Sequence, residues 1–143
     1  MSEPFRRSAD GIVVDLPDEL RRWLLSEAEQ AGADANTMGD PVHHRLLGPI
    51  DLSADHDDPL IELQRQFAVE GPLERFVATA FATVLSEDEA EEWIRAFQLM
   101  LAAAAARLAV QTEDDVARLG QEASSELTTL QAGISLLIDA LDT

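Results

Sequence analysis

Three histidines are the side chains of this sequence whose chemistry best suits a metal ion. His43 and His44 are adjacent, and His56 lies within Asp55-His56-Asp57-Asp58. Neutral imidazoles and carboxylates bind divalent metals, so a metal-dependent hydrolase that uses His43, His44 and His56 is one hypothesis. The sequence contains no His-x-x-x-His or Glu-x-x-His pair, the usual spacing of ligands on a helix. We therefore interpret the three histidines as part of a solvated loop.

Paired acidic residues suggest a second kind of chemistry. Glu89-x-x-Glu92 is similar to the magnesium-binding pairs of all-α nucleotide pyrophosphohydrolases, which need a second pair that faces the first. The nearest candidate, Asp139-x-x-Asp142, is at the C-terminus, and the helix dipole already explains carboxylates in a first helical turn. Cysteine, Gly-x-Ser-x-Gly and glycine-rich phosphate loops are absent from the sequence. We therefore expect a protein without catalytic residues, bound metal or cofactor.

Two arginine pairs, Arg6-Arg7 and Arg21-Arg22, could contact DNA phosphates from a strand and a helix. A transcription-associated regulator that contacts DNA through Arg6, Arg7, Arg21 and Arg22 is therefore an alternative hypothesis. Acidic residues surround both pairs, however, and the formal net charge of the chain is −18. Because affinity for phosphate comes from cations that displace counterions, this charge disfavours nucleic acid and anionic membrane as partners. The absence of cysteine and of an apolar N-terminal signal favours a cytoplasmic location.

The clearest structural signal is the start of a helix at Ser86. Ser86 and Glu89 have the residue types and spacing of a capping box. The apolar residues that follow are Ala90, Trp93, Ile94, Phe97, Met100, Leu101, Ala104, Ala105 and Leu108. Their recurrence every three or four positions predicts a long helix with one face in the core.

The N-terminal part predicts a β-ribbon followed by a helix. β-branched residues after the Asp10-Gly11 turn signal favour a short hairpin or a single strand within residues 1–16. Pro17 suits the first position of a helix over residues 17–31, and Gly32 is expected to end that helix.

Apolar residues do not recur at a regular spacing in residues 32–57. We therefore predict a loop there, with one helical turn at Pro41–Leu47. We expect Ile50 and Leu52 to pack down onto the core from this loop. Residues 58–142 are then expected to form a helical bundle.

The first helix of this bundle is predicted to begin at Asp58-Pro59, an N-cap followed by a first-turn proline. Its apolar face consists of Leu60, Leu63, Phe67 and Ile61. Gly71-Pro72 is expected to stop this helix and to start another, because proline is disfavoured in a helix interior. The apolar face of that second helix consists of Leu73, Phe76, Val77, Ala80, Phe81, Val84 and Leu85.

The C-terminal part poses a question of length. A continuous helix over Glu113–Asp142 would be about 45 Å long, which exceeds the expected size of one globule of this chain length. Gly120 offers a break, so we expect a short helix at 113–119 and a final helix at about 124–142 that Ser124 or Ser125 caps. The apolar face of the final helix consists of Leu127, Leu130, Ile134, Leu137, Ile138 and Leu141.

Small side chains suggest how the last two long helices meet. The alanine run 102–106 lets another helix approach closely, and Gly133 on the final helix could receive it. The residues of this interaction or packing face are Trp93, Phe97, Ala104, Leu130, Gly133, Leu137 and Leu141. An antiparallel pair within one chain is favoured, and a two-fold homodimer through the same face is the functional alternative. The whole pattern predicts a single all-α domain over residues 1–143, a compact bundle of five to six helices with a short N-terminal β-ribbon.

The order of these parts resembles a known family. The matching motifs are Arg45-Leu46-Leu47-x-Pro49, Asp57-Asp58-Pro59, Leu85-Ser86-Glu87-x-x-Ala90-x-x-Trp93-Ile94-Arg95-Ala96, Arg107-Leu108-Ala109-Val110-x-Thr112-Glu113-Asp114 and Leu130-Gln131. Together they resemble the bacterial domain of unknown function family numbered two thousand and seventeen, found mainly in high-GC Gram-positive bacteria. The stretch after Asp114 is shorter than is typical of that family.

The resemblance implies little about function. Members are described as uncharacterised or as transcriptional regulators, often encoded near an adaptor of the Clp protease, and the family supplies no catalytic residues. We therefore expect a cytoplasmic regulatory or adaptor protein that acts through protein–protein contacts without catalysis. We expect its partners to be a protein of unknown identity and a second copy of the chain in a homodimer.

Overall fold

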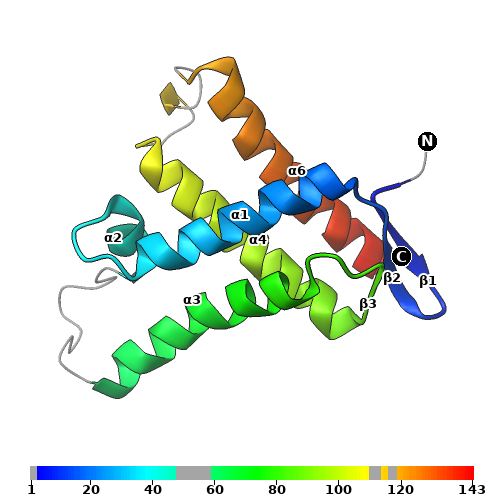
Figure 1. The fold of residues 1–143 in the computed structure, drawn as a ribbon. Helices are drawn as coiled ribbons and strands as arrows, with labels where there is room; N and C mark the ends of the chain where they lie inside the picture. Colours follow the sequence, from blue (N-terminus) through cyan, green and yellow to red (C-terminus); the bar gives the residue numbers. More distant parts are fainter. Residues whose placement is uncertain (1–2, 48–58, 110–113, 116–118) are drawn as a thin grey trace.

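The computed structural model describes residues 3–47, 59–109, 114–115 and 119–143 (Figure 1). Its elements are β1 (Phe5–Ser8), β2 (Gly11–Val14), α1 (Asp18–Ala35), α2 (Pro41–Leu47), α3 (Pro59–Thr79), β3 (Val84–Leu85), α4 (Glu87–Arg107) and α6 (Gln121–Asp142). Helices dominate, and α4 packs against α1, α2, α3 and α6. None of the described helices combines the length and the apolar character that a membrane span requires.

The strands form a three-stranded antiparallel sheet in the order β1-β2-β3. The hairpin at Asp10-Gly11 is confirmed, with Phe5 opposite Val14. Gly11 has a φ of +134°, and a Cβ at this position would collide with the carbonyl oxygen of Leu85. A side chain would therefore be strained here and would also push β3 away.

Strand β3 corrects the prediction of an all-α fold with a two-stranded ribbon. The sequence pattern predicts that Val84 and Leu85 end a helical face, but they pair with Val13 and Ile12 of β2. The amide of Val14 also donates to the carbonyl of Thr83 at 2.8 Å. Two residues are too few for a periodic signal, and the open edge of the hairpin decides their conformation.

Helix α1 continues past the glycine that was expected to end it. It covers Asp18–Ala35, with Pro17 as the N-cap residue, so the prediction that Gly32 terminates the helix is wrong. A glycine in a helix costs only about 1 kcal/mol. Burial of Ala31 and Ala35 on either side of Gly32 offsets that cost.

Helix α3 is one helix, so the predicted break at Gly71-Pro72 is also wrong. Pro72 cannot donate a backbone hydrogen bond to the preceding turn. Val69 and Leu73 are buried on either side of this position, and their packing holds both parts of the helix in line. The predicted cap at Asp58 lies outside the described residues, as do Ile50 and Leu52.

Helix α4 carries the aromatic core. The predicted capping box at its start is confirmed, since Ser86 and Glu89 exchange hydrogen bonds of 2.9 and 3.1 Å. Trp93 is surrounded by three phenylalanine rings, with centroid distances of 4.8 Å to Phe76, 5.9 Å to Phe97 and 6.3 Å to Phe5. Its indole N–H donates to the hydroxyl of Thr79 at 2.7 Å, so the only polar atom of this side chain is satisfied.

The break predicted near Gly120 is confirmed, because α6 begins at Gln121 with Gly120 as its N-cap residue. The expected cap at Ser124 or Ser125 is wrong, since both residues lie within the helix. In Figure 1, α6 runs beside α4 in the opposite direction. A Cβ built on Gly133 would lie 3.0 Å from a carbon of the Phe97 ring, so the two helices meet closely at this glycine.

Gly133→Val should therefore lower the free energy of unfolding by about 1–3 kcal/mol, because the added carbons overlap the buried Phe97 ring. Urea denaturation followed by circular dichroism measures this change. Ser135→Val, at an exposed position of the same helix, is the control for helix propensity. Equal stability of the two variants would contradict the close packing at Gly133.

Candidate functional site

The structure places two of the three histidines on α2. His43 Nδ1 donates to the carbonyl oxygen of Ala35 at 2.6 Å, and His44 is exposed. His56 lies outside the described residues. Within the described part of the chain, no group of three or more metal-ligating side chains could hold an ion.

The acidic pair on α4 is engaged within the fold. Glu89 belongs to the capping box. Glu92 bridges Arg75 of α3 and Arg95 of α4, with 2.8 Å between the paired atoms in both contacts. Asp139 and Asp142 are exposed near the end of α6. The contacts of Glu89 and Glu92 therefore have structural explanations.

The four arginines considered for DNA binding have different environments. Arg7 forms an ion pair with Glu87 and donates to the carbonyl oxygen of Leu141 at 3.2 Å. Arg6 and Arg22 are exposed. Arg21 is only 5% exposed.

The guanidinium of Arg21 donates to four backbone carbonyl oxygens. These belong to Ala82 at 2.8 Å, Ala80 at 2.9 Å, and Leu16 and Val14 at 3.2 Å. Arg21 thus joins the end of β2, the start of α1 and the turn after α3. It is not available to contact DNA, which corrects its assignment as a phosphate contact.

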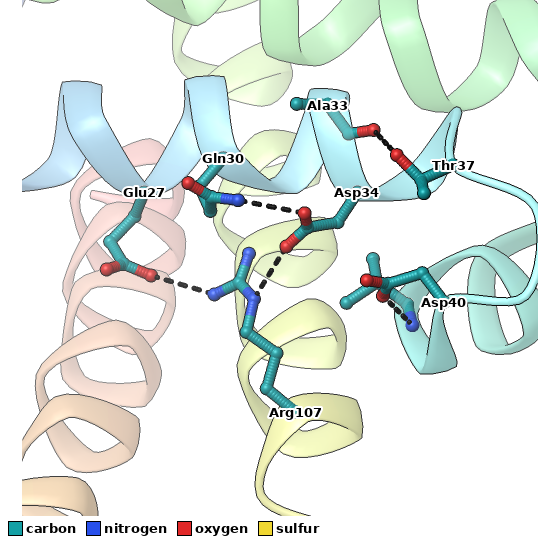
Figure 2. A network of polar contacts seen from close by, with 8 residues as sticks. Glu27, Gln30, Ala33, Asp34, Thr37, Asp40 and Arg107 are labelled. Carbon is teal, nitrogen blue, oxygen red and sulfur yellow. Dashed lines mark hydrogen bonds and ion pairs between the residues drawn. The ribbon is translucent and has the colours of Figure 1, made fainter.

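A polar network joins the end of α4 to α1 (Figure 2). Arg107 donates to Asp34 at 3.0 Å and to Glu27 at 3.4 Å, and Gln30 donates to Asp34 at 2.8 Å. Burial raises the pKa of Glu126 on α6, and the charges of Glu27 and Glu122 raise it further, while Arg107 lowers it. The hydrogen bonds of this network join α1 to α4, and the carboxylates of Glu27 and Asp34 are both paired with Arg107.

The surface of α3 carries a feature of a different kind. Its first half presents Leu60, Leu63 and Phe67, which are 60%, 46% and 62% exposed. The spacing i, i+3, i+7 places them on one face of the helix. We call these three residues the α3 stripe. In Figure 1 the beginning of α3 lies apart from the other described helices, at the lower edge of the molecule.

An apolar cleft lies between α1 and α6. Its volume is about 520 Å³, and its apolar walls include Leu16, Leu20, Leu24, Phe97, Leu130 and Leu136. Polar side chains of the first turns of α6 line one side. We call this hollow the α1–α6 cleft.

The predicted interaction or packing face lies mainly inside the chain. Trp93, Phe97, Ala104, Leu130 and Leu137 are buried. Gly133 and Leu141 are half-buried, with Gly133 against the Phe97 ring. The packing of α4 on α6 within one chain therefore uses the face that could otherwise have formed a dimer.

Sequence reasoning identified the α3 stripe as an apolar face but not as an exposed one. The sequence does not predict the α1–α6 cleft. Ser124 and Ser125 have the residue type of helix caps, and the spacing of the leucines is typical of a buried face. Comparison of the chain with protein-family models, curated proteins and solved structures gives no match. The resemblance to the bacterial family therefore stays a prediction.

Arg21→Met should lower the free energy of unfolding by about 3 kcal/mol, because buried carbonyl oxygens lose a charged donor. Arg22→Met, at the adjacent exposed position, should change it by no more than about 0.5 kcal/mol. Chemical denaturation of both variants measures the difference. Similar values would show that the Arg21 contacts contribute little.

Glu126→Gln should change how stability depends on pH. Because the pKa of Glu126 in the folded state lies above its ordinary value of 4.5, the folded state keeps this proton where the unfolded state has released it. The contribution of this protonated carboxyl group to the free energy of unfolding is fully present below pH 4.5. It is lost as the pH rises through the raised pKa. The Gln variant cannot ionise, so its unfolding free energy should fall less over this range.

Urea denaturation at a series of pH values tests this expectation. Glu91→Gln removes an exposed carboxylate of α4 and controls for the loss of one negative charge. A wild-type pH profile in Glu126→Gln would contradict the raised pKa.

Proposed function

We propose that this protein is a cytoplasmic regulatory or adaptor protein that acts through protein–protein contacts rather than through catalysis. The observation that carries the proposal is the exposed α3 stripe. Contiguous exposed apolar residues cost free energy in water and mark interaction sites on soluble domains. Leu60, Leu63 and Phe67 have the helical spacing with which one helix anchors in a partner.

The partner that best fits the α3 stripe is a second copy of the chain. Residues 59–69 contain one acidic residue, Glu62, and one basic residue, Arg65, so their formal charge is zero in a chain of charge −18. Two such segments can approach without local repulsion between like charges. A strongly basic partner would find more attraction elsewhere on the surface.

The spacing of the stripe also suits a two-fold axis. If two α3 helices pack antiparallel with Leu63 at the axis, Leu60 of one copy lies near Phe67 of the other. Such a self-complementary contact is isologous, the commonest type in homodimers. The stripe spans only about 10 Å of helix, so we expect weak and reversible association that a regulator could control.

Salt should strengthen this dimer. Added salt screens the repulsion between two acidic chains, and it leaves the apolar contact intact. Light scattering should therefore show a higher dimer fraction at high salt than at low salt. Binding to a basic partner would show the opposite dependence.

The double variant Leu63→Asp, Phe67→Asp should remain folded and monomeric, because it places two charges in the contact. Ala68→Asp adds a charge at an exposed position outside the stripe and should dimerise like the wild type. Sedimentation equilibrium over a range of concentrations measures both. A wild-type chain that stays monomeric at high micromolar concentration and high salt would contradict the homodimer.

Cross-linking in native cytoplasm tests the broader proposal of protein–protein contacts. Partners that act through the α3 stripe should be captured by the wild type and by Ala68→Asp, and lost in the double variant. Identical capture by all three proteins would contradict the role of the stripe.

A further inference from the structure

The α1–α6 cleft has the size of a small-molecule site. Its volume of about 520 Å³ lies within the range of roughly 300–1,000 Å³ that ligand pockets occupy. Leu16, Leu20 and Leu24 form one wall, and Leu130 and Leu136 lie on the helix opposite.

The polar side chains among the described lining residues all belong to α6. Thr128 and Thr129 donate their hydroxyl protons to the carbonyl oxygens of Ser124 and Ser125, at 2.9 and 2.8 Å. Their oxygens can therefore only accept a further hydrogen bond.

Three other side chains on this wall have unused donors. Within the described chain, the side chains of Gln121, Ser124 and Ser125 make no hydrogen bond, and all three line the cleft. They occupy positions i, i+3 and i+4 of the first turns of α6, so they lie on one face. A hydroxyl group of a ligand could donate to them or accept from them, and a carbonyl group could accept from them.

The electrostatic environment of the cleft disfavours charged ligands. Among the described residues, no charged side chain lines the cleft, and Glu3 and Glu122 adjoin the lining residues Pro4 and Gln121 in the sequence. An anion would therefore meet repulsion from a chain of charge −18. A cation would lose its hydration against carbon walls without a carboxylate in the lining to pair with it.

We propose that the α1–α6 cleft binds a small uncharged amphiphile. Its hydrocarbon part lies between the leucines of α1 and those of α6, and its single hydroxyl or carbonyl group faces Gln121, Ser124 and Ser125. Long-chain alcohols and neutral lipid-derived alcohols or ketones belong to this chemical class. The site is separate from the α3 stripe and does not depend on the proposed dimer.

Fluorescence of the uncharged probe N-phenyl-1-naphthylamine tests the site on the full chain. We expect the probe to bind, 1-decanol to displace it, and decanoate to displace it much less at pH 8. Equal displacement by decanoate would overturn the selection for an uncharged ligand. Absence of probe binding would overturn the site itself.

Two variants that fill the cleft test whether the probe binds there. Ala132→Phe and Ser125→Trp place rings at lining positions, and each should weaken probe binding by about tenfold or more. Ser135→Phe, at an exposed position of α6 that does not line the cleft, should bind like the wild type. An equal loss of probe affinity in Ser135→Phe would show that the probe does not bind in the cleft.

The polar wall has its own test. The double variant Ser124→Ala, Ser125→Ala should keep the affinity for the probe and weaken that for 1-decanol several-fold. Unchanged 1-decanol affinity would overturn the role of these hydroxyls. The α3 variant Leu63→Asp, Phe67→Asp should bind the probe normally, so failure of the cleft and failure of the dimer remain distinguishable.

Discussion

The packing of aromatic rings around Trp93 is the constraint on which the rest of the molecule depends. Phe5 brings the sheet to α4, Phe76 brings α3, and Phe97 extends the cluster to α6 at Gly133. Edge-to-face pairs of this kind contribute about 0.5–1.5 kcal/mol each beyond the burial of their area. Segments that are far apart in the sequence therefore meet on one face of one helix.

This arrangement decides which surfaces remain for function. The most apolar faces of α4 and α6 are used within the chain, so they are not available to a partner. The α3 stripe and the α1–α6 cleft are two apolar features that stay open to solvent. One is a convex helix face suited to another protein, and the other is a concave hollow suited to a small molecule.

The distribution of charge follows a similar logic. Arg21 and Arg107 serve the fold, since Arg21 binds carbonyl oxygens in the core and Arg107 joins α4 to α1. Much of the excess negative charge lies on exposed side chains, which favours solubility and disfavours polyanions as partners. The segment at the start of α3, residues 59–69, carries no formal net charge.

Local chemistry was sufficient to predict several elements. The capping box at Ser86, the turn at Gly11, the helix at Pro41–Leu47 and the break at Gly120 all depend on residues within a few positions of one another. Only the tertiary structure decided that α1 passes Gly32, that α3 contains Pro72 and that Val84–Leu85 forms a strand. The physical reason is that burial and strand pairing outweigh helix-breaking propensities of a few kcal/mol. The burial of Arg21, the exposure of the α3 stripe and the existence of the cleft depend in the same way on which distant segments come together.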